Sequence, residues 1–215
     1  MRHIAKGKAP ETLRATAQAN RNAGLNPAAR DEFNQIDKGE VRTRLSEDQG
    51  GLCAYCMDRI DPEKLDADGK PTTRIAHWMP IDAAPSLALD WKNLLGSCSS
   101  PSSCDIAQKQ AVLATNPTVV GHIAKLAYER DPTGAERLLL TSPDVSASRD
   151  IEALGLNKGD LPANRYAVWK AFLADFKQAD SGAYGRPAWR AFFQSQRRNP
   201  QRLPLYLGVI EAKLR

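Results

Sequence analysis

The sequence predicts an α+β fold that is mostly helical and is organised around a cluster of cysteines. Apolar residues recur at near-helical spacing before residue 50 and through most of the chain beyond Pro117. Two short segments, 73–78 and 136–141, instead have the composition of strands. All four cysteines of the 215-residue chain lie between positions 53 and 104. We therefore expect a small mixed core that the cysteines hold together and that helices surround.

The expected elements follow one another in three regions: 1–50, 51–117 and 118–215. The first region holds an arm and a short helix over 1–30 and a helix over 31–49, which Gly50 and Gly51 end. The second holds the first cysteine pair, a loop over 57–73, a strand over 73–78 that ends at Pro80, a short apolar segment over 90–98 and a helix over 104–113. In the third we expect a strand over 136–141, a loop or hinge over 178–187, and helices over 119–130, 147–154, 162–178, 186–197 and 203–213.

The composition is that of an ordinary globular protein with a basic bias. Hydrophobic residues make up 42% and charged residues 26% of the chain, and the net charge is +5. No apolar run approaches the roughly 20 residues of a membrane helix, so no membrane association is expected. The first residues contain no apolar segment of a secretory signal, so the expected compartment is the cytoplasm, where structural disulfides are rare. The basic bias favours a nucleic-acid partner.

The four cysteines form two pairs, Cys53 with Cys56 and Cys98 with Cys104. The first pair alone fits a redox couple, a disulfide or half of a metal site. Two pairs separated by a long insert are typical of a tetrahedral zinc site, although the second spacing is wider than usual. No βαβ pattern surrounds the first pair, which disfavours a redox function, and four free buried cysteines would leave the clustering unexplained. We expect a structural Zn²⁺ ion bound by all four.

The insert between the two pairs contains the candidate chemistry. His77 is the only one of the chain's three histidines within it, at the end of the strand expected over 73–78. A lone histidine is more often structural than catalytic, but this position between the halves of a metal site favours a function. Asn93 lies in the same insert, and Asp105 directly follows the last cysteine.

Four motifs, "CAYC", "HWMP", "WKNLLGSC" and "CDIAQK", in this order resemble an HNH endonuclease with an added four-cysteine zinc knuckle. The stretches "MRHIAKGKAP", "EDQGGLCAYC", "CDIAQKQAVLATNP" and "DIEALGLNKGDLPANR" resemble more closely the retron-associated and Septu-type HNH nucleases of anti-phage defence. The resemblance covers roughly residues 1–170. It implies a ββα-metal core over 51–117, in which a β-hairpin and a helix hold one divalent metal, usually Mg²⁺.

The resemblance also implies roles for three residues and for several partners. His77 would be the general base that deprotonates a water for attack on a phosphodiester. Asn93 would orient the histidine or its loop, and Asp105 would bind the catalytic metal, which stabilises the developing charge. The implied partners are an ABC- or SMC-like ATPase and, in retron systems, a reverse transcriptase with its RNA–DNA hybrid. The substrate, DNA or RNA, stays open.

Two positions depart from the family pattern. Family members carry a carboxylate directly before the catalytic histidine, where this chain has Ala76. We therefore expect slow cleavage or none, and a gain of activity in Ala76→Glu at limiting Mg²⁺, unless Ala76 packs under the hairpin. The alternative function is a catalytically impaired, zinc-stabilised subunit that binds nucleic acid or a partner; a redox or metal-handling role ranks last. At the second position Gln108 replaces the family's lysine, and Lys109 follows it.

The remaining candidate residues are basic. The residues expected to contact nucleic acid are Lys109, Arg186, Arg190, Arg197 and Arg198. The four arginines stand among Trp189, Phe192 and Phe193, so this segment also fits an amphipathic helix whose aromatic residues face the core. Docking to a partner protein, in which Trp and Arg are enriched, is a third interpretation.

Overall fold

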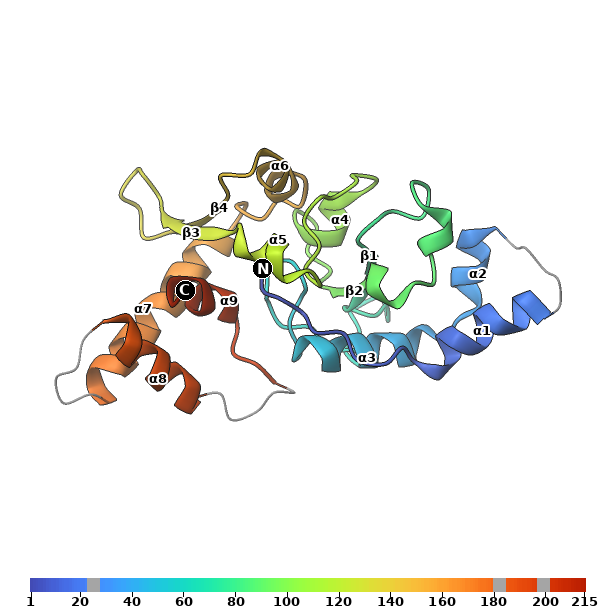
Figure 1. Ribbon diagram of the computed structural model, residues 1–215, viewed down its shortest axis with the longest axis horizontal. Helices are drawn as coiled ribbons and strands as arrows, with labels where there is room; N and C mark the ends of the chain where they lie inside the picture. The colour runs from blue at the N-terminus through green and yellow to red at the C-terminus, as the bar shows by residue number, and fades with distance from the viewer. Residues whose placement is uncertain (23–27, 180–184, 197–201) are drawn as a thin grey trace.

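The structure, a computed structural model, describes residues 1–22, 28–179, 185–196 and 202–215 (Figure 1). Its fold is α+β, with two small antiparallel sheets among helices, and no helix of the described ranges is long and apolar enough to cross a membrane. The helices are α1 (Glu11–Asn22), α2 (Ala29–Gln35), α3 (Lys38–Gln49), α4 (Cys104–Gln108), α5 (Val120–Ala124), α6 (Val145–Ala153), α7 (Leu161–Ala179), α8 (Arg186–Gln196) and α9 (Leu207–Lys213). The strands are β1 (Arg74–His77), β2 (Leu94–Ser97), β3 (Ala127–Arg130) and β4 (Leu138–Thr141).

The first sheet carries His77, the central residue of the expected site. Strands β1 and β2 pair antiparallel, with Ala76 opposite Leu95 and His77 opposite Leu94. Helix α4 packs on β1, and α3 packs on both strands. The segment between the strands, 78–93, contains two short 3₁₀ helices, η1 (Pro85–Leu87) and η2 (Trp91–Asn93). His77 is therefore the last residue of the first of two strands. A long connection joins these strands, and a helix follows the second one.

The side chain of Gln49, at the end of α3, ties that helix to β2. Its amide donates to the carbonyls of Leu52 (2.6 Å) and Gly96 (2.9 Å), and its carbonyl accepts from the Gly96 N–H (2.7 Å). A Cβ at position 96 would stand 2.9 Å from Ile60 Cδ1 and 3.1 Å from Gln49 Nε2, so glycine allows this close approach. Gln49 is buried, and satisfying its polar atoms in this way makes the burial tolerable.

The helix expected over 31–49 is two helices. Helix α2 ends at Gln35, Ile36 is buried in extended conformation, and α3 begins after Asp37. The Asp37 carboxylate accepts from the N–H groups of Gly39 and Glu40 and so caps α3. The expected end of the helix is confirmed, because Gly50 adopts the left-handed conformation (φ 64°) there.

The helix expected over 119–130 is wrong in its second half. Helix α5 ends at Ala124, and residues 127–130 form β3, which pairs with the expected strand β4. Tyr128 lies opposite Leu140, and both side chains are buried. A cross-strand pair of this kind stabilises a strand that local propensity leaves undecided.

The later helices agree with expectation apart from their ends. Helix α4 stops at Gln108 rather than at residue 113, because Lys109 takes a positive φ of 52°. Helix α9 starts at Leu207 rather than at residue 203, after Tyr206 with a positive φ of 52°. Of the loop or hinge expected over 178–187, residues 180–184 lie outside the described residues.

One hydrophobic core joins the cysteine region to the C-terminal helices. It contains Cys53 and Cys104, Leu154 from the end of α6, and Leu207 from α9. The two chain ends approach each other at this core, where Arg2 forms an ion pair with Glu211 at 3.3 Å (Figure 1). A second, smaller core lies under α3 and holds Val41 and Leu45 against Trp91.

Candidate metal centre and cationic cleft

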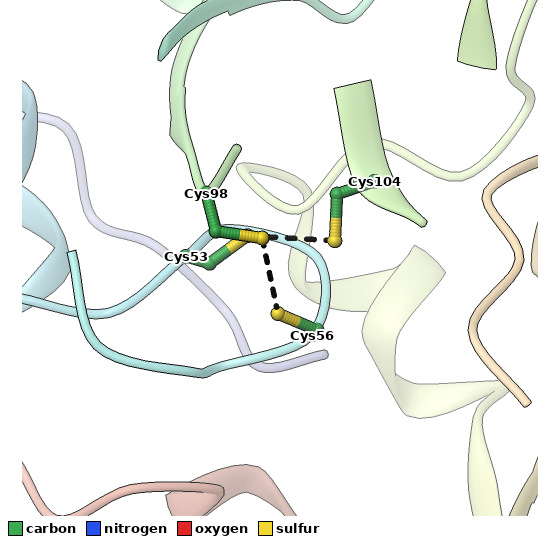
Figure 2. A group of neighbouring side chains, drawn as sticks. All are labelled: Cys53, Cys56, Cys98 and Cys104. Carbon is green, nitrogen blue, oxygen red and sulfur yellow. Dashed lines mark hydrogen bonds between the residues drawn. The ribbon is translucent and has the colours of Figure 1, made fainter. Parts of the chain in front are cut away.

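The four cysteines converge on one point. Figure 2 shows two of them on the turn after α3, one at the end of β2 and one at the start of α4. Their sulfur atoms all lie within 4.8 Å of one another, and the Cys53–Cys104 and Cys56–Cys98 separations are both 3.7 Å. Four thiolates at about 2.3 Å from a zinc ion would be about 3.8 Å apart. The donor type and the spacing therefore fit a tetrahedral metal site.

Backbone contacts hold the cysteine turns in place. The Cys53 N–H donates to the Asp58 carbonyl at 2.8 Å, and the Met57 N–H donates to the Cys53 carbonyl at 3.1 Å. The Asp58 N–H donates to the Cys56 sulfur at 3.4 Å, a contact that favours the thiolate form. Cys104 has a positive φ of 59°, and its N–H donates to the Leu154 carbonyl at 2.8 Å. The strain of that conformation is offset because α6 holds the residue in place.

A buried arginine stands close to the cysteine cluster. Arg165 of α7 is fully buried, and its guanidinium donates to the Leu156 carbonyl (2.6 Å) and to Asn157 Oδ1 (3.0 Å). Burial lowers the pKa of Arg165, while Tyr128, Cys56 and other acidic groups nearby favour its charge. Within the described residues it forms no ion pair with a carboxylate. If the four cysteines bound a metal as thiolates, a cation so placed would offset part of their negative charge.

His77 lines a cleft of about 310 Å³ between the first sheet, α2 and α4. Three cations and one carboxylate share this cleft, which is lined by Arg30, Phe33, Asn34, Arg74, Ile75, His77, Pro80, Ile81, Asp105, Gln108, Lys109 and Gln110. The three residues predicted from the HNH resemblance therefore do not all line the cleft. His77 and Asp105 line the same cleft, and Asn93 does not.

One ring nitrogen of His77 is held by the loop between the strands. Nε2 lies 3.0 Å from the Ala88 carbonyl, and because a carbonyl only accepts, Nε2 carries the proton in the neutral ring. The lone pair is then on Nδ1. The Phe33 ring and the imidazole form a T-shaped contact at a centroid distance of 4.6 Å. Burial lowers the pKa of His77 below its usual 6.5, so the ring is neutral at pH 7 and can accept a proton.

Asn93 fixes the loop that holds His77. It is buried, its Oδ1 accepts from the Met79 N–H (2.7 Å), and its Nδ2 donates to the carbonyls of Met79 and Leu87 (both 3.0 Å). Leu87 precedes Ala88, whose carbonyl contacts His77. Asn93 is therefore placed to position the histidine through the loop, without direct contact.

Asp105 is already paired with a cation. Its Oδ2 lies 2.5 Å from Arg74 Nε, and Asp105 is the single carboxylate among the described residues that line the cleft. Apart from the four cysteines, the described residues contain no group of three or more His, Cys, Asp or Glu side chains arranged to bind a metal. The cleft therefore has a net positive charge, which disfavours binding of a free cation.

The two positions that depart from the family pattern have structural roles. Ala76 is fully buried in the main hydrophobic core, and this burial favours the packing interpretation of Ala76. Gln108 is also buried, and its Nε2 donates to the carbonyls of His77 (3.0 Å) and Trp78 (3.1 Å). It thereby fixes the backbone of the histidine to α4. Lys109 is exposed and lines the cleft.

Of the predicted C-terminal arginines, the two that the structure describes, Arg186 and Arg190, do not line this cleft. Arg186 is exposed, whereas Arg190 donates to the carbonyls of Leu214 (2.5 Å) and Arg215 (2.9 Å) at the end of the described chain. Arg197 and Arg198 lie outside the described residues. The aromatic residues of α8 pack on α7, with Trp189 against Trp169 and Phe192 against Phe176, as an amphipathic helix requires.

Sequence reasoning missed Arg30 and Arg74 as residues of the site. Both line the cleft beside His77, and neither belongs to the motifs. Arg74 carried one available signal, since it stands three residues before the histidine on the expected strand. Arg30 carried none, because its position depends on how α2 packs against the loop that contains η1.

The chain is distantly similar to a known protein. No family model matches the chain. The chain is 26% identical over 129 residues to a protein named Septu protein PtuB from Bacillus thuringiensis. The matched part covers 57% of this chain and 43% of that protein, so the chain spans less than half the length of the relative. The likeness is to a Septu protein, and it is confined to this shared part.

Proposed function

We propose that this chain is an HNH-type nuclease subunit of a Septu-type anti-phage defence system and that it hydrolyses phosphodiester bonds of a nucleic acid. Its similarity to a protein named Septu PtuB supports the biological setting. The order of β1, β2 and α4 around His77 supports a ββα core of the HNH kind. The four cysteines would bind Zn²⁺, which would connect the turn after α3 to the end of β2 and the start of α4.

One observation carries the proposal: a neutral histidine stands beside three protein cations in one cleft. Nδ1 of His77 would take a proton from a water molecule, which attacks the phosphorus atom. The bond to the leaving oxygen breaks, and that oxygen takes a proton from solvent. Arg74, Arg30 and Lys109 would stabilise the negative charge on the phosphate oxygens in the transition state.

The residues do not fit a Mg²⁺ ion held by the protein, as predicted at Asp105. Mg²⁺ in proteins is usually bound by one or two carboxylates together with substrate phosphate and water. Here the single carboxylate of the cleft is paired with Arg74, and Ala76 supplies no ligand. The positive charge that the reaction needs is present on the three basic side chains instead.

A second candidate function is a subunit that binds nucleic acid without cutting it. Two observations favour it, namely the buried Ala76 and the Arg74–Asp105 ion pair. Both leave binding by the basic side chains intact. The partners implied by the family resemblance, an ABC- or SMC-like ATPase and a reverse transcriptase with its RNA–DNA hybrid, remain part of the proposal for either function.

The test is a cleavage assay on the chain purified with its co-encoded partners. Labelled DNA and RNA are incubated with and without added Mg²⁺, using the parent and His77→Gln. Glutamine retains an amide donor for the Ala88 carbonyl but has no basic nitrogen. We expect cleavage by the parent and none by the variant. Binding without cleavage in both proteins would support the second function and refute the first.

A further inference from the structure

A second cleft opens directly beside the one that contains His77. It has a volume of about 260 Å³ and shares Phe33, Arg74 and Ile75 with the first. Its remaining lining residues are Lys38, Arg42, Lys70, Pro71 and Thr73. Since three residues line both clefts, the two lie side by side across β1 and between α2 and α3. We call the two clefts together the basic groove.

Basic side chains far outnumber acidic ones in the lining of the basic groove. Its lining contains six cations, Arg30, Lys38, Arg42, Lys70, Arg74 and Lys109, and one carboxylate, Asp105. The whole chain, by contrast, has 30 basic and 25 acidic residues. A ratio of six to one is therefore a local concentration of positive charge and not the average of a basic protein.

Arg30 pairs with Asp82 at 2.8 Å and Arg74 with Asp105 at 2.5 Å, so the charge that the protein leaves largely unneutralised is that of the other cations of the groove. The Nε atom of Arg42 is buried and has no hydrogen-bond partner in the described structure, and burial lowers the pKa of its guanidinium. The nearest acid acting on it is Asp37, whose carboxylate already caps α3. Lys38 contacts neutral groups, namely Asn34 Oδ1 at 2.9 Å and the Phe33 ring at 5.0 Å. The Lys70–Asp68 pair, at 3.6 Å, is largely exposed and contributes little.

An aromatic ring stands at the junction of the two clefts. Phe33 is half-buried, lines both clefts, and packs against the His77 ring in a T-shaped contact. A groove that combines basic side chains with an aromatic ring is typical of proteins that bind single-stranded nucleic acid, because bases stack on the ring while the cations follow the backbone.

We infer that the basic groove binds the sugar–phosphate backbone of a single nucleic-acid strand. The reacting phosphate lies beside His77, and the phosphates next to it along the strand contact Lys38, Arg42 and Lys70. This rests on the proposed function, which requires a phosphate beside His77, and adds the path that the strand takes. It places the main contact surface across α2, β1 and α3 rather than on the arginines of α8.

The experiment compares charge-neutralising variants at the two surfaces. Lys38→Gln/Lys70→Gln removes two cations of the groove that are not part of the hydrophobic core, and Arg186→Gln removes an exposed cation of α8 as the matched control. Binding of short fluorescent single-stranded DNA and RNA is followed by anisotropy from about 50 to about 200 mM salt. Melting curves confirm that each variant is folded.

We expect the groove variant to raise the Kd about tenfold and to reduce the salt slope by about 1.4, since each lost phosphate contact on a single strand contributes about 0.7. The control should match the parent. An unchanged slope in the groove variant, or a loss of binding in Arg186→Gln instead, would overturn the inference. Equally tight binding of an acidic peptide would overturn the choice of nucleic acid as the ligand.

The same assay separates the groove from the proposed function. His77→Gln should retain the Kd of the parent, because the substitution leaves all six cations in place. If the groove variant binds normally while His77→Gln still abolishes cleavage, the groove is wrong and the nuclease function stands. If His77→Gln cuts normally while the groove variant loses binding, the groove stands and the role of His77 as the base is wrong.

Discussion

Replacing Asn93 by alanine is the sharpest test of how the fold positions His77. The substitution removes three hydrogen bonds, one from the Met79 N–H at 2.7 Å and two to the carbonyls of Met79 and Leu87 at 3.0 Å. The site is buried, so water cannot easily replace them. Each such bond contributes about 1 kcal/mol net, so we expect Asn93→Ala to lower the free energy of unfolding by about 3 kcal/mol.

The effect on the reaction should be similar in free energy to the effect on folding. Without Asn93, the loop over 78–93 loses the contacts next to Ala88, whose carbonyl holds Nε2 of the histidine. A displacement of about 1 Å at a catalytic group can cost about 100-fold in rate, and we expect a loss of this order under conditions in which the variant is folded.

Denaturant unfolding and single-turnover cleavage measure the two effects separately. Lys92→Ala is the matched control, because Lys92 is the exposed neighbour of Asn93 on η2. Asn93→Asp is a second variant: it keeps an acceptor for the Met79 N–H but cannot donate to the two carbonyls. If Asn93→Ala has the same free energy of unfolding and the same cleavage rate as the parent, the loop does not position His77 and the reasoning is refuted.

Two further predictions concern the metal centre and the strand beneath the histidine. Cys98→Ser should lower zinc content, measured by elemental analysis, and should unfold or aggregate the core, because structural zinc contributes on the order of 10 kcal/mol; a folded, zinc-free variant would contradict this. Ala76→Glu should lower the melting temperature without raising cleavage at any Mg²⁺ concentration, because position 76 is fully buried and an added carboxylate would lose its hydration. This replaces the gain of activity expected from the sequence, and a faster Ala76→Glu enzyme with an unchanged melting temperature would restore that expectation.

The sequence predicted the centre of the molecule better than its margins. The spacing of Cys53, Cys56, Cys98 and Cys104 predicted that they converge, because few arrangements other than a metal site require two distant cysteine pairs. The strand before His77 was equally readable, since Ile75 and its neighbours are bounded by turn residues on both sides.

The errors occur where tertiary contacts decide the local structure. Residues 119–130 fit a helix until β4 offers a partner for Tyr128. The break at Ile36 had a signal in Asp37, a good helix-capping residue followed by Glu40, but an apolar spacing that continued through it concealed the break.

The basic groove could not be predicted from sequence. Its cations extend from position 30 to position 109 and come from five separate segments of the chain. The arginines near the C-terminus are adjacent in sequence and attracted attention for that reason. Arg190 instead contacts backbone carbonyls at the end of the chain, and among the predicted nucleic-acid contacts that the structure describes, Lys109 is the one that lines the cleft.

The pH dependence of single-turnover cleavage tests the central claim most directly. Burial lowers the pKa of His77, so the neutral, proton-accepting form is the majority form at pH 6.5 and above. The rate should therefore be constant near pH 8 and should fall with acidification as pH drops through the lowered pKa, which lies below the usual 6.5. Folding stability should fall over the same acid range, because the unfolded chain binds the proton more readily than the folded protein does. His77→Gln should show no such pH-dependent cleavage. A parent whose rate keeps rising above pH 8, or a glutamine variant with the same profile, would show that His77 is not the base.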